Sequence, residues 1–243
     1  MSSAPDLFVV CKQCGSEVSP YITECPYCGH RLRRRAPDLP REKGTGPQRR
    51  LRRPRLGRPT DSRPYVTILL VAASCVVWVV LHAKPTLYLD MAIFGPLHGD
   101  WWKLLTSQFA YGDGLYAFVT LVAIAIFGWL CERRHGPAVV LALALGAGVA
   151  GALVASAVYT EPLVSGGNAA ALALLGAWVV PDLKAARAGD YYEGDLLGAA
   201  AIAALLLAIP FARPEASWLA GVTGGVLGLV LGLGMYRSGP EER

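Results

Sequence analysis

The sequence is poor in charged residues and in histidine. Charged side chains make up 17% of the 243 residues, well below the roughly 25% of an ordinary soluble domain, whereas 53% of the residues are hydrophobic and the mean hydropathy is +0.39. This balance excludes an ordinary soluble globular protein and predicts a membrane protein with a short soluble extension. There are four histidines and none follows residue 135; they are His30, His82, His98 and His135.

The basic residues gather in one part of the chain. Between Arg31 and Arg63 there are 13 Lys or Arg residues against three acids, whereas only nine basic residues follow Arg63. The net charge of +5 is therefore local, and nucleic-acid binding is not expected. Residues 33–64 are rich in Arg, Pro and Gly without apolar periodicity, which is typical of a disordered linker. Because this linker precedes an apolar segment, it is interpreted as a topology signal and as a contact for the anionic headgroups of a lipid bilayer.

Four of the six cysteines lie near the start of the chain, as two Cys-x-x-Cys pairs ten residues apart. Two such turns present four thiolates, which suits a tetrahedral zinc ion better than a disulfide framework and implies a reducing compartment. The ten-residue spacer suits a small β-hairpin. The pattern resembles the zinc-ribbon family over residues 8–32, although four free cysteines are the alternative. The expected Zn2+ ligands are Cys11, Cys14, Cys25 and Cys28, with His30 as a surface residue.

Six apolar segments without Asp, Glu, Lys or Arg divide the rest of the chain, and most are long enough to cross a bilayer. Counting from the basic linker on the inner side, six crossings return the C-terminus to the cytosol, so both termini are expected there. The expected location is the plasma membrane of a prokaryote. The segments are Tyr65–His82, Leu115–Cys131, Ala138–Thr160, the shorter Gly166–Pro181, Leu196–Ala212 and Ala216–Tyr236.

Four short motifs follow one another along these segments, and their order and spacing are similar to those of the rhomboid family. They are Asp100-Trp101-Trp102-Lys103, Glu132-Arg133-x-x-Gly136, Gly166-Gly167-Asn168-Ala169 and Ala220-Gly221-x-x-Gly224-x-x-x-Gly228. The resemblance implies an all-α membrane protein, a six-transmembrane-helix rhomboid-like bundle over residues 65–236 that a small zinc ribbon precedes. Lys103 stands where the family usually has arginine. Independently, Gly224 and Gly228 form a GxxxG pair that predicts close helix packing.

The differences from the family pattern lie at the positions that carry out catalysis in rhomboid proteases. Rhomboid proteases are described as using a serine at the start of the fourth helix and a histidine in the sixth; the matching residues here are Asn168 and Gly221. The positions of the two residues that assist the oxyanion, on the second helix, hold Tyr116 and Thr120. An amide cannot serve as an acyl nucleophile and glycine has no side chain to take a proton. Ser165 lies near in sequence but would still lack a base.

Three functions follow from these residues. The leading interpretation is a rhomboid-like pseudoprotease that binds transmembrane clients without cleaving them, with the polar side chains of Tyr116, Thr120 and Asn168 contacting an unwound segment. Interhelical hydrogen bonding is an equal alternative for these three residues. The second interpretation is an intramembrane serine protease with a rearranged site. A channel or transporter is disfavoured because the segments lack buried charge and an obvious inverted repeat.

Overall fold

The computed structural model describes residues 9–19, 22–32, 63–189 and 194–237. Nearly all of the predicted linker, residues 33–62, lies outside this description. The chain separates into two compact units, residues 1–53 and 54–243, which are treated one at a time below.

The first unit is built from two similar turns around the cysteine pairs. Strand β1 (Val9–Val10) pairs antiparallel with β2 (Glu17–Val18), so the first Cys-x-x-Cys turn forms the tip of this hairpin. A single bridge between Glu24 and Arg31 frames the second turn in the same way. The hairpin predicted within the spacer is therefore displaced: its two strands flank the first cysteine pair. A strand on each side of the pair lets the turn fold back sharply and bring both thiols to one side.

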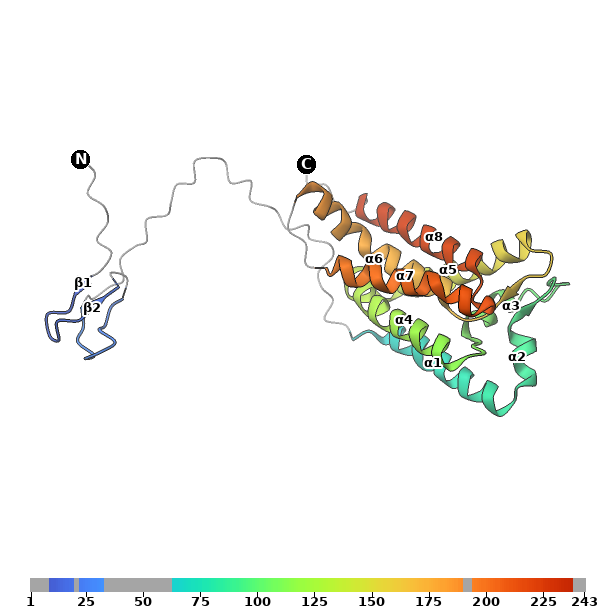
Figure 1. The fold of residues 1–243 in the computed structure, drawn as a ribbon, viewed down its shortest axis with the longest axis horizontal. Helices are drawn as coiled ribbons and strands as arrows, with labels where there is room; N and C mark the ends of the chain where they lie inside the picture. Colours follow the sequence, from blue (N-terminus) through green and yellow to red (C-terminus); the bar gives the residue numbers. More distant parts are fainter. Residues whose placement is uncertain (1–8, 20–21, 33–62, 190–193, 238–243) are drawn as a thin grey trace. The chain divides into compact units, whose positions relative to one another are not determined.

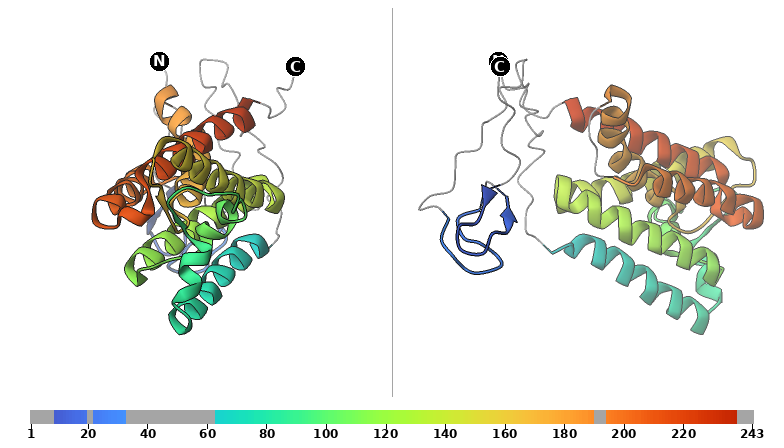
Figure 2. Two further views of the ribbon diagram at one scale, coloured as in Figure 1. Left: turned by 90° about the vertical axis from the view of Figure 1, so that its right-hand side faces the viewer. Right: turned by 60° about the vertical axis from the view of Figure 1, so that its left-hand side comes forward.

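The second unit is a bundle of six long helices with smaller elements in three of its connections (Figures 1 and 2). This confirms the predicted all-α bundle. Five of its helices are long and apolar enough to cross a membrane, and α7 is shorter at 17 residues. The helices are α1 (Tyr65–Ala83), α2 (Thr86–Met91), α3 (Lys103–Thr106), α4 (Gly114–His135), α5 (Pro137–Val158), α6 (Asn168–Ala188), α7 (Leu196–Ala212) and α8 (Trp218–Arg237), with the 3-10 turns η1 (Ser107–Phe109) and η2 (Pro214–Ala216) and the paired strands β3 (Ile93–Phe94) and β4 (Leu163–Val164).

The fourth predicted segment, Gly166–Pro181, ends earlier than the helix that the structure contains there. Helix α6 continues through Pro181 to Ala188 and is 21 residues long. A proline inside a helix removes one backbone hydrogen bond, but neighbouring groups stabilise this turn. Arg134 of α4 donates to the carbonyl oxygen of Trp178 at 3.1 Å and pairs with Asp182 at 3.5 Å. The shortest membrane helix is consequently the fifth, α7, and not the fourth.

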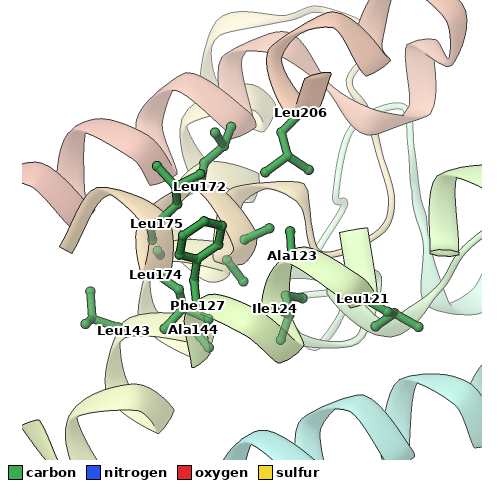
Figure 3. Close-up of a cluster of buried hydrophobic side chains, with 14 of the residues drawn as sticks. Leu121, Ala123, Ile124, Phe127, Leu143, Ala144, Leu172, Leu174, Leu175 and Leu206 are labelled. Atoms are coloured by element: carbon green, nitrogen blue, oxygen red, sulfur yellow. The ribbon is translucent and has the colours of Figure 1, made fainter. Parts of the chain in front are cut away.

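Helix α6 lies at the centre of the bundle, and most of its apolar window is buried. Its leucines meet side chains of α4, α5 and α7 in one apolar cluster (Figure 3). The labelled members of this cluster are Leu121, Ala123, Ile124, Phe127, Leu143, Ala144, Leu172, Leu174, Leu175 and Leu206. The start of α6 is thereby held among three other helices.

Helices α6 and α8 approach each other through small residues. A Cβ atom added at Gly224 would meet the backbone of Ala169, and one added at Gly228 would meet the backbone of Ala173. One turn further on, a Cβ at Gly232 would lie 2.9 Å from the Cα of Ala177. A glycine stripe on α8 therefore lies on an alanine stripe on α6, the packing mode by which small residues stabilise helix pairs in lipid.

Glu132 fastens α4 to the start of α1. Its carboxylate accepts from the N–H groups of Val66 and Thr67 at 3.1 and 2.9 Å, and from the Thr67 hydroxyl at 2.7 Å. The first N–H groups of a helix have no partner within the helix, so a carboxylate there satisfies them and complements the helix dipole. Glu132 is only 1% exposed, and Gly128 leaves room for the side chain of Thr67 one turn away.

Replacing Glu132 with alanine is expected to destabilise the bundle by about 2–4 kcal/mol, because it leaves three donors, two of them buried, without an acceptor. The stability of Glu132→Gln should lie between that of the natural protein and that of Glu132→Ala, since one amide oxygen remains to accept. The measurement is thermal unfolding in detergent, followed by circular dichroism. Arg133→Ala is the control, because Arg133 is exposed and its guanidinium lies 5.7 Å over the Trp129 ring. Equal losses from Glu132→Ala and Arg133→Ala would refute the capping role.

Candidate functional site

The four cysteines of the first unit converge. Their sulfur atoms all lie within 4.8 Å of one another, and the pairs Cys11–Cys28 and Cys14–Cys25 are each 3.7 Å apart. A tetrahedral zinc ion with Zn–S bonds of about 2.3 Å requires S···S separations of about 3.8 Å. The donor set and its spacing therefore fit a tetrahedral metal ion.

The backbone around the cysteines repeats the same pattern twice. Gly15 donates to the Cys11 carbonyl oxygen at 2.8 Å, and Gly29 donates to the Cys25 carbonyl oxygen at 2.9 Å. Both glycines have φ near +70°, a conformation that other residues rarely adopt. Hydrogen bonds with the side chain and then the backbone of Ser16 lower the pKa of the Cys14 thiol to about 6, which favours its thiolate form. Thiolates are the form that binds metal.

The second unit places Asn168 and Gly221 face to face. Asn168 begins α6 and is 1% exposed, and a Cβ atom added at Gly221 would lie 2.9 Å from its Nδ2. The same Nδ2 donates to the carbonyl oxygen of Leu206 in α7 at 3.3 Å. No partner for Oδ1 is found in the described part of the chain. The amide of Asn168 therefore fills the space beside Gly221, and neither position offers a nucleophile or a base.

Three tyrosines surround the turn that precedes α6. The Tyr88 hydroxyl lies 2.9 Å from the Ser165 hydroxyl, and the Tyr116 hydroxyl donates to the Ser165 carbonyl oxygen at 2.8 Å. Gly167 donates its N–H to the Tyr111 hydroxyl at 3.1 Å, and the rings of Tyr111 and Tyr116 meet edge to face at 5.4 Å. These side chains hold the backbone of the turn in place. The amide N–H of Gly167 is therefore already paired and cannot donate to a ligand without exchanging partners.

Ser165 has no activating base among its partners. It is fully buried, and the partners found for it in residues 63–189 and 194–237 are Tyr88, Tyr116 and the carbonyl oxygen of Glu215. Burial raises the pKa of the Tyr88 hydroxyl, and burial likewise raises that of Tyr111. Both hydroxyls are therefore protonated at neutral pH and do not accept a proton from serine.

Thr120 faces the same turn. It lies between Tyr116 and Ile124 on one stripe of α4 at four-residue spacing, and those two side chains contact the positions of Gly166 and Gly167. Thr120 is fully buried, and its hydroxyl has no partner within the described residues. The Thr120 hydroxyl is therefore a buried polar group without a partner in the described residues, as is Oδ1 of Asn168.

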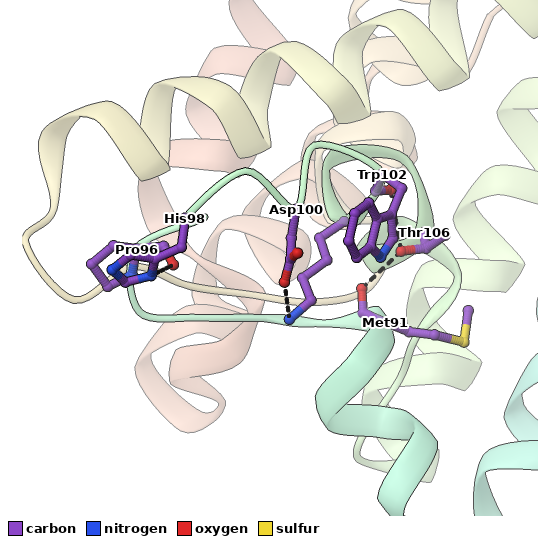
Figure 4. Close-up of polar contacts among 7 residues, drawn as sticks. Met91, Pro96, His98, Asp100, Trp102 and Thr106 are labelled. Atoms are coloured by element: carbon purple, nitrogen blue, oxygen red, sulfur yellow. Dashed lines mark hydrogen bonds and ion pairs between the residues drawn. The ribbon is translucent and has the colours of Figure 1, made fainter.

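The Asp-Trp-Trp-Lys motif lies in the connection between α1 and α4 (Figure 4). Lys103 pairs with Asp100 at 3.3 Å, and the Thr106 hydroxyl, one helical turn further on, donates to the carbonyl oxygen of Met91 at 3.0 Å. Trp101 and Trp102 are mostly exposed. Exposed tryptophans beside membrane helices are typical of the boundary between lipid and water.

The comparison with protein families decides the identity of the second unit. The model of the Rhomboid domain matches residues 98–238, more than half of the chain. The chain belongs to the rhomboid family. The match runs from the tryptophan motif to the end of α8, so it includes all four rhomboid motifs identified in the sequence. No curated protein shows significant similarity to the sequence.

Several contacts of this rhomboid domain could not be read from the motifs. Asp113 caps α4 by accepting from the N–H of Tyr116, and its other oxygen pairs with Arg213 at 2.6 Å after the end of α7. Arg134, and not the motif residue Arg133, makes the ion pair with Asp182. An acid before an apolar segment is a sequence signal for the cap. Arg213 lies 100 residues from Asp113, and Asp182 lies 48 residues from Arg134. The sequence carries no signal for either pair.

Proposed function

We propose that this protein is a non-catalytic rhomboid, a pseudoprotease that binds transmembrane clients without cleaving them. One observation carries the proposal: Asn168 and Gly221, at the positions matching the family's serine and histidine, face each other with 2.9 Å between the Cβ position of Gly221 and Nδ2 of Asn168. The two positions are arranged as in a catalytic dyad. However, the side chain of Asn168 is an amide and that of Gly221 is a hydrogen atom. Neither attacks a carbonyl carbon or accepts a proton.

Client binding is supported by the hydrogen-bonding groups that the domain leaves unused. The hydroxyl of Thr120 and Oδ1 of Asn168 are both buried and both lack a partner among the described residues. Buried polar groups are usually paired, so an unwound client segment would supply the missing donors and acceptors with its own backbone. The alternative, a serine protease with a rearranged site, rests on Ser165, whose neighbour Tyr88 is a poor base.

The experiment uses the full-length chain in detergent with a model transmembrane peptide that contains a helix-breaking residue. The unmodified protein and Asn168→Ser should neither cleave it nor react with a fluorophosphonate probe, because a hydroxyl alone has no base. Asn168→Ser with Gly221→His is expected to cleave slowly at most, since losing one oxyanion donor costs roughly 10²–10³ in rate. A photocrosslinker at position 168 should capture the uncut peptide better than one at Val226, which is exposed on α8.

Two results would contradict the proposal. Cleavage by the unmodified chain that a serine-directed inhibitor abolishes would show an active protease, and Ser165→Ala would then test whether Ser165 is the nucleophile. Equal crosslinking from positions 168 and 226 would remove the support for a client site beside Asn168.

For the first unit we propose a zinc ribbon in which Cys11, Cys14, Cys25 and Cys28 hold one structural Zn2+ ion. The support is the four-thiol donor set, whose sulfur atoms all lie within 4.8 Å of one another and form two pairs 3.7 Å apart. Four cysteine ligands leave no open position for water, which is the mark of a structural and not a catalytic zinc site. We further propose that both termini face the reducing cytosol of a prokaryote, where thiolates persist and where the basic linker contacts anionic lipid.

A further inference from the structure

Helix α7 contains a proline that leaves one of its carbonyl groups without a partner in the helix. Pro210 has no N–H, so it cannot donate to the carbonyl oxygen four residues earlier, which belongs to Leu206. Leu206 is fully buried, and no water is available inside the hydrocarbon region to pair with its backbone. The carbonyl oxygen of Leu206 therefore needs a donor from another helix.

Asn168 supplies that donor. Its Nδ2 lies 3.3 Å from the carbonyl oxygen of Leu206. A carbonyl oxygen only accepts hydrogen bonds, so the NH2 group of the amide, and not its oxygen, must face α7. Gly221 makes room for this arrangement, because a Cβ atom there would lie 2.9 Å from the same nitrogen. Asn168, Leu206 and Gly221 belong to α6, α7 and α8, respectively.

We propose that Asn168 is a positioning residue for α7: its side-chain amide replaces the N–H that Pro210 lacks and so locks α7 onto the start of α6. This inference does not depend on client binding. It explains why the side chain at position 168 is an amide. A serine hydroxyl is attached directly to Cβ, one bond nearer the backbone than Nδ2, and from the same backbone position it falls short of Leu206.

A second contact holds the same end of α7. Arg213, directly after the helix, pairs with Asp113 at the start of α4. That ion pair is partly exposed, so it contributes little to stability. The hydrogen bond of Asn168 is enclosed and cannot be exchanged for one with water. Loss of the amide should therefore loosen the last turns of α7, from Leu206 onward, more than loss of the ion pair does.

The test is a double-mutant cycle of Asn168→Ala and Pro210→Ala in the full-length chain, with backbone hydrogen exchange of α7 measured by mass spectrometry. In the natural background Asn168→Ala should speed exchange in the last turns of α7 about tenfold, the effect of one buried hydrogen bond. In the Pro210→Ala background, the new N–H of residue 210 donates to the carbonyl oxygen of Leu206 within α7. Asn168→Ala should then change exchange less than about twofold.

Two controls separate the hydrogen bond from simple space filling. Asn168→Leu keeps the branched shape of the side chain and fills its space but lacks the donor, and it should also speed exchange about tenfold, even if the alanine variant fails to fold. Ser156→Ala removes a buried hydroxyl of α5 that has no partner in the described residues, and it should leave α7 unchanged. Slow exchange in Asn168→Leu, or an equal effect of Asn168→Ala in both proline backgrounds, would overturn the proposal.

Discussion

Chelating the zinc ion proposed for the cysteine cluster is expected to unfold residues 9–32 while the helical bundle remains folded. Within residues 9–19 and 22–32, the buried apolar core of this unit consists of Cys11, Val18 and Cys25, with Ile22 and Leu32 partly buried beside them. A core of this size cannot offset the conformational entropy of the chain, so the free energy of metal binding must supply the folding energy. For a structural zinc ion that free energy is about 10–16 kcal/mol.

The measurement is alkylation of cysteine in the purified full-length protein, before and after addition of a chelator. All measurements use the Cys75→Ser variant, because Cys75 is an exposed thiol in α1 outside the cluster and would otherwise react. The metal-loaded protein should contain about one zinc per chain and protect its four N-terminal thiols. After chelation all four should react together, and restoring zinc should restore protection. Protection that persists in metal-free protein would show that the cysteines are held by the polypeptide alone.

Local sequence signals predicted the elements whose geometry is local. The spacing of the four cysteines predicted their convergence, since each pair lies on one tight turn and the ten-residue spacer reaches back across the unit. Hydropathy predicted five helices closely, because uncharged segments of 17 or more residues have few alternatives in a membrane. The hairpin was misplaced because the strands are two residues long, too short to leave a periodic pattern.

The fourth segment was misjudged because proline and a carboxylate are reliable end signals only for an isolated helix. In the folded bundle, Arg134 pairs with Asp182 and with the carbonyl oxygen of Trp178, so α6 continues past Pro181. Both partners lie more than 40 residues from Arg134. A tertiary contact at that separation decides the end of the helix, and no local pattern contains it.

The motifs located the candidate site but not the roles of its residues. The resemblance to rhomboids identified Asn168 and Gly221 as replacements, and it gave no reason for choosing an amide. The reason emerges only when Leu206, 38 residues further along the chain, is placed against Asn168. The role of Pro210 is a consequence of packing between α6 and α7, which hydropathy does not encode.

Adding a single methyl group at Gly228 is expected to disrupt the bundle. The Cβ atom of Gly228→Ala would overlap the carbonyl oxygen, the Cα and the carbonyl carbon of Ala173 in α6. These are backbone atoms of the most enclosed helix, so they cannot rotate away as a flexible side chain could. Helix α8 would have to move outward and would lose its contacts along the alanine stripe of α6. We expect a loss of roughly 3 kcal/mol, the upper end of the usual range for overpacking, because the backbone of Ala173 cannot relieve it.

Gly225→Ala provides a matched control with the same chemical change on the same helix, three residues away. Its Cβ atom would make an ordinary contact of 3.7 Å with Cβ of Leu172. Because alanine also favours the helix over glycine, this variant should be as stable as the natural protein or slightly more so. Thermal unfolding in detergent, followed by tryptophan fluorescence and gel filtration, compares the two variants. If Gly228→Ala melts within about 2 °C of Gly225→Ala, a shift of about 0.5–1 kcal/mol for a domain of this size, the close approach of α6 and α8 is not what holds the bundle together.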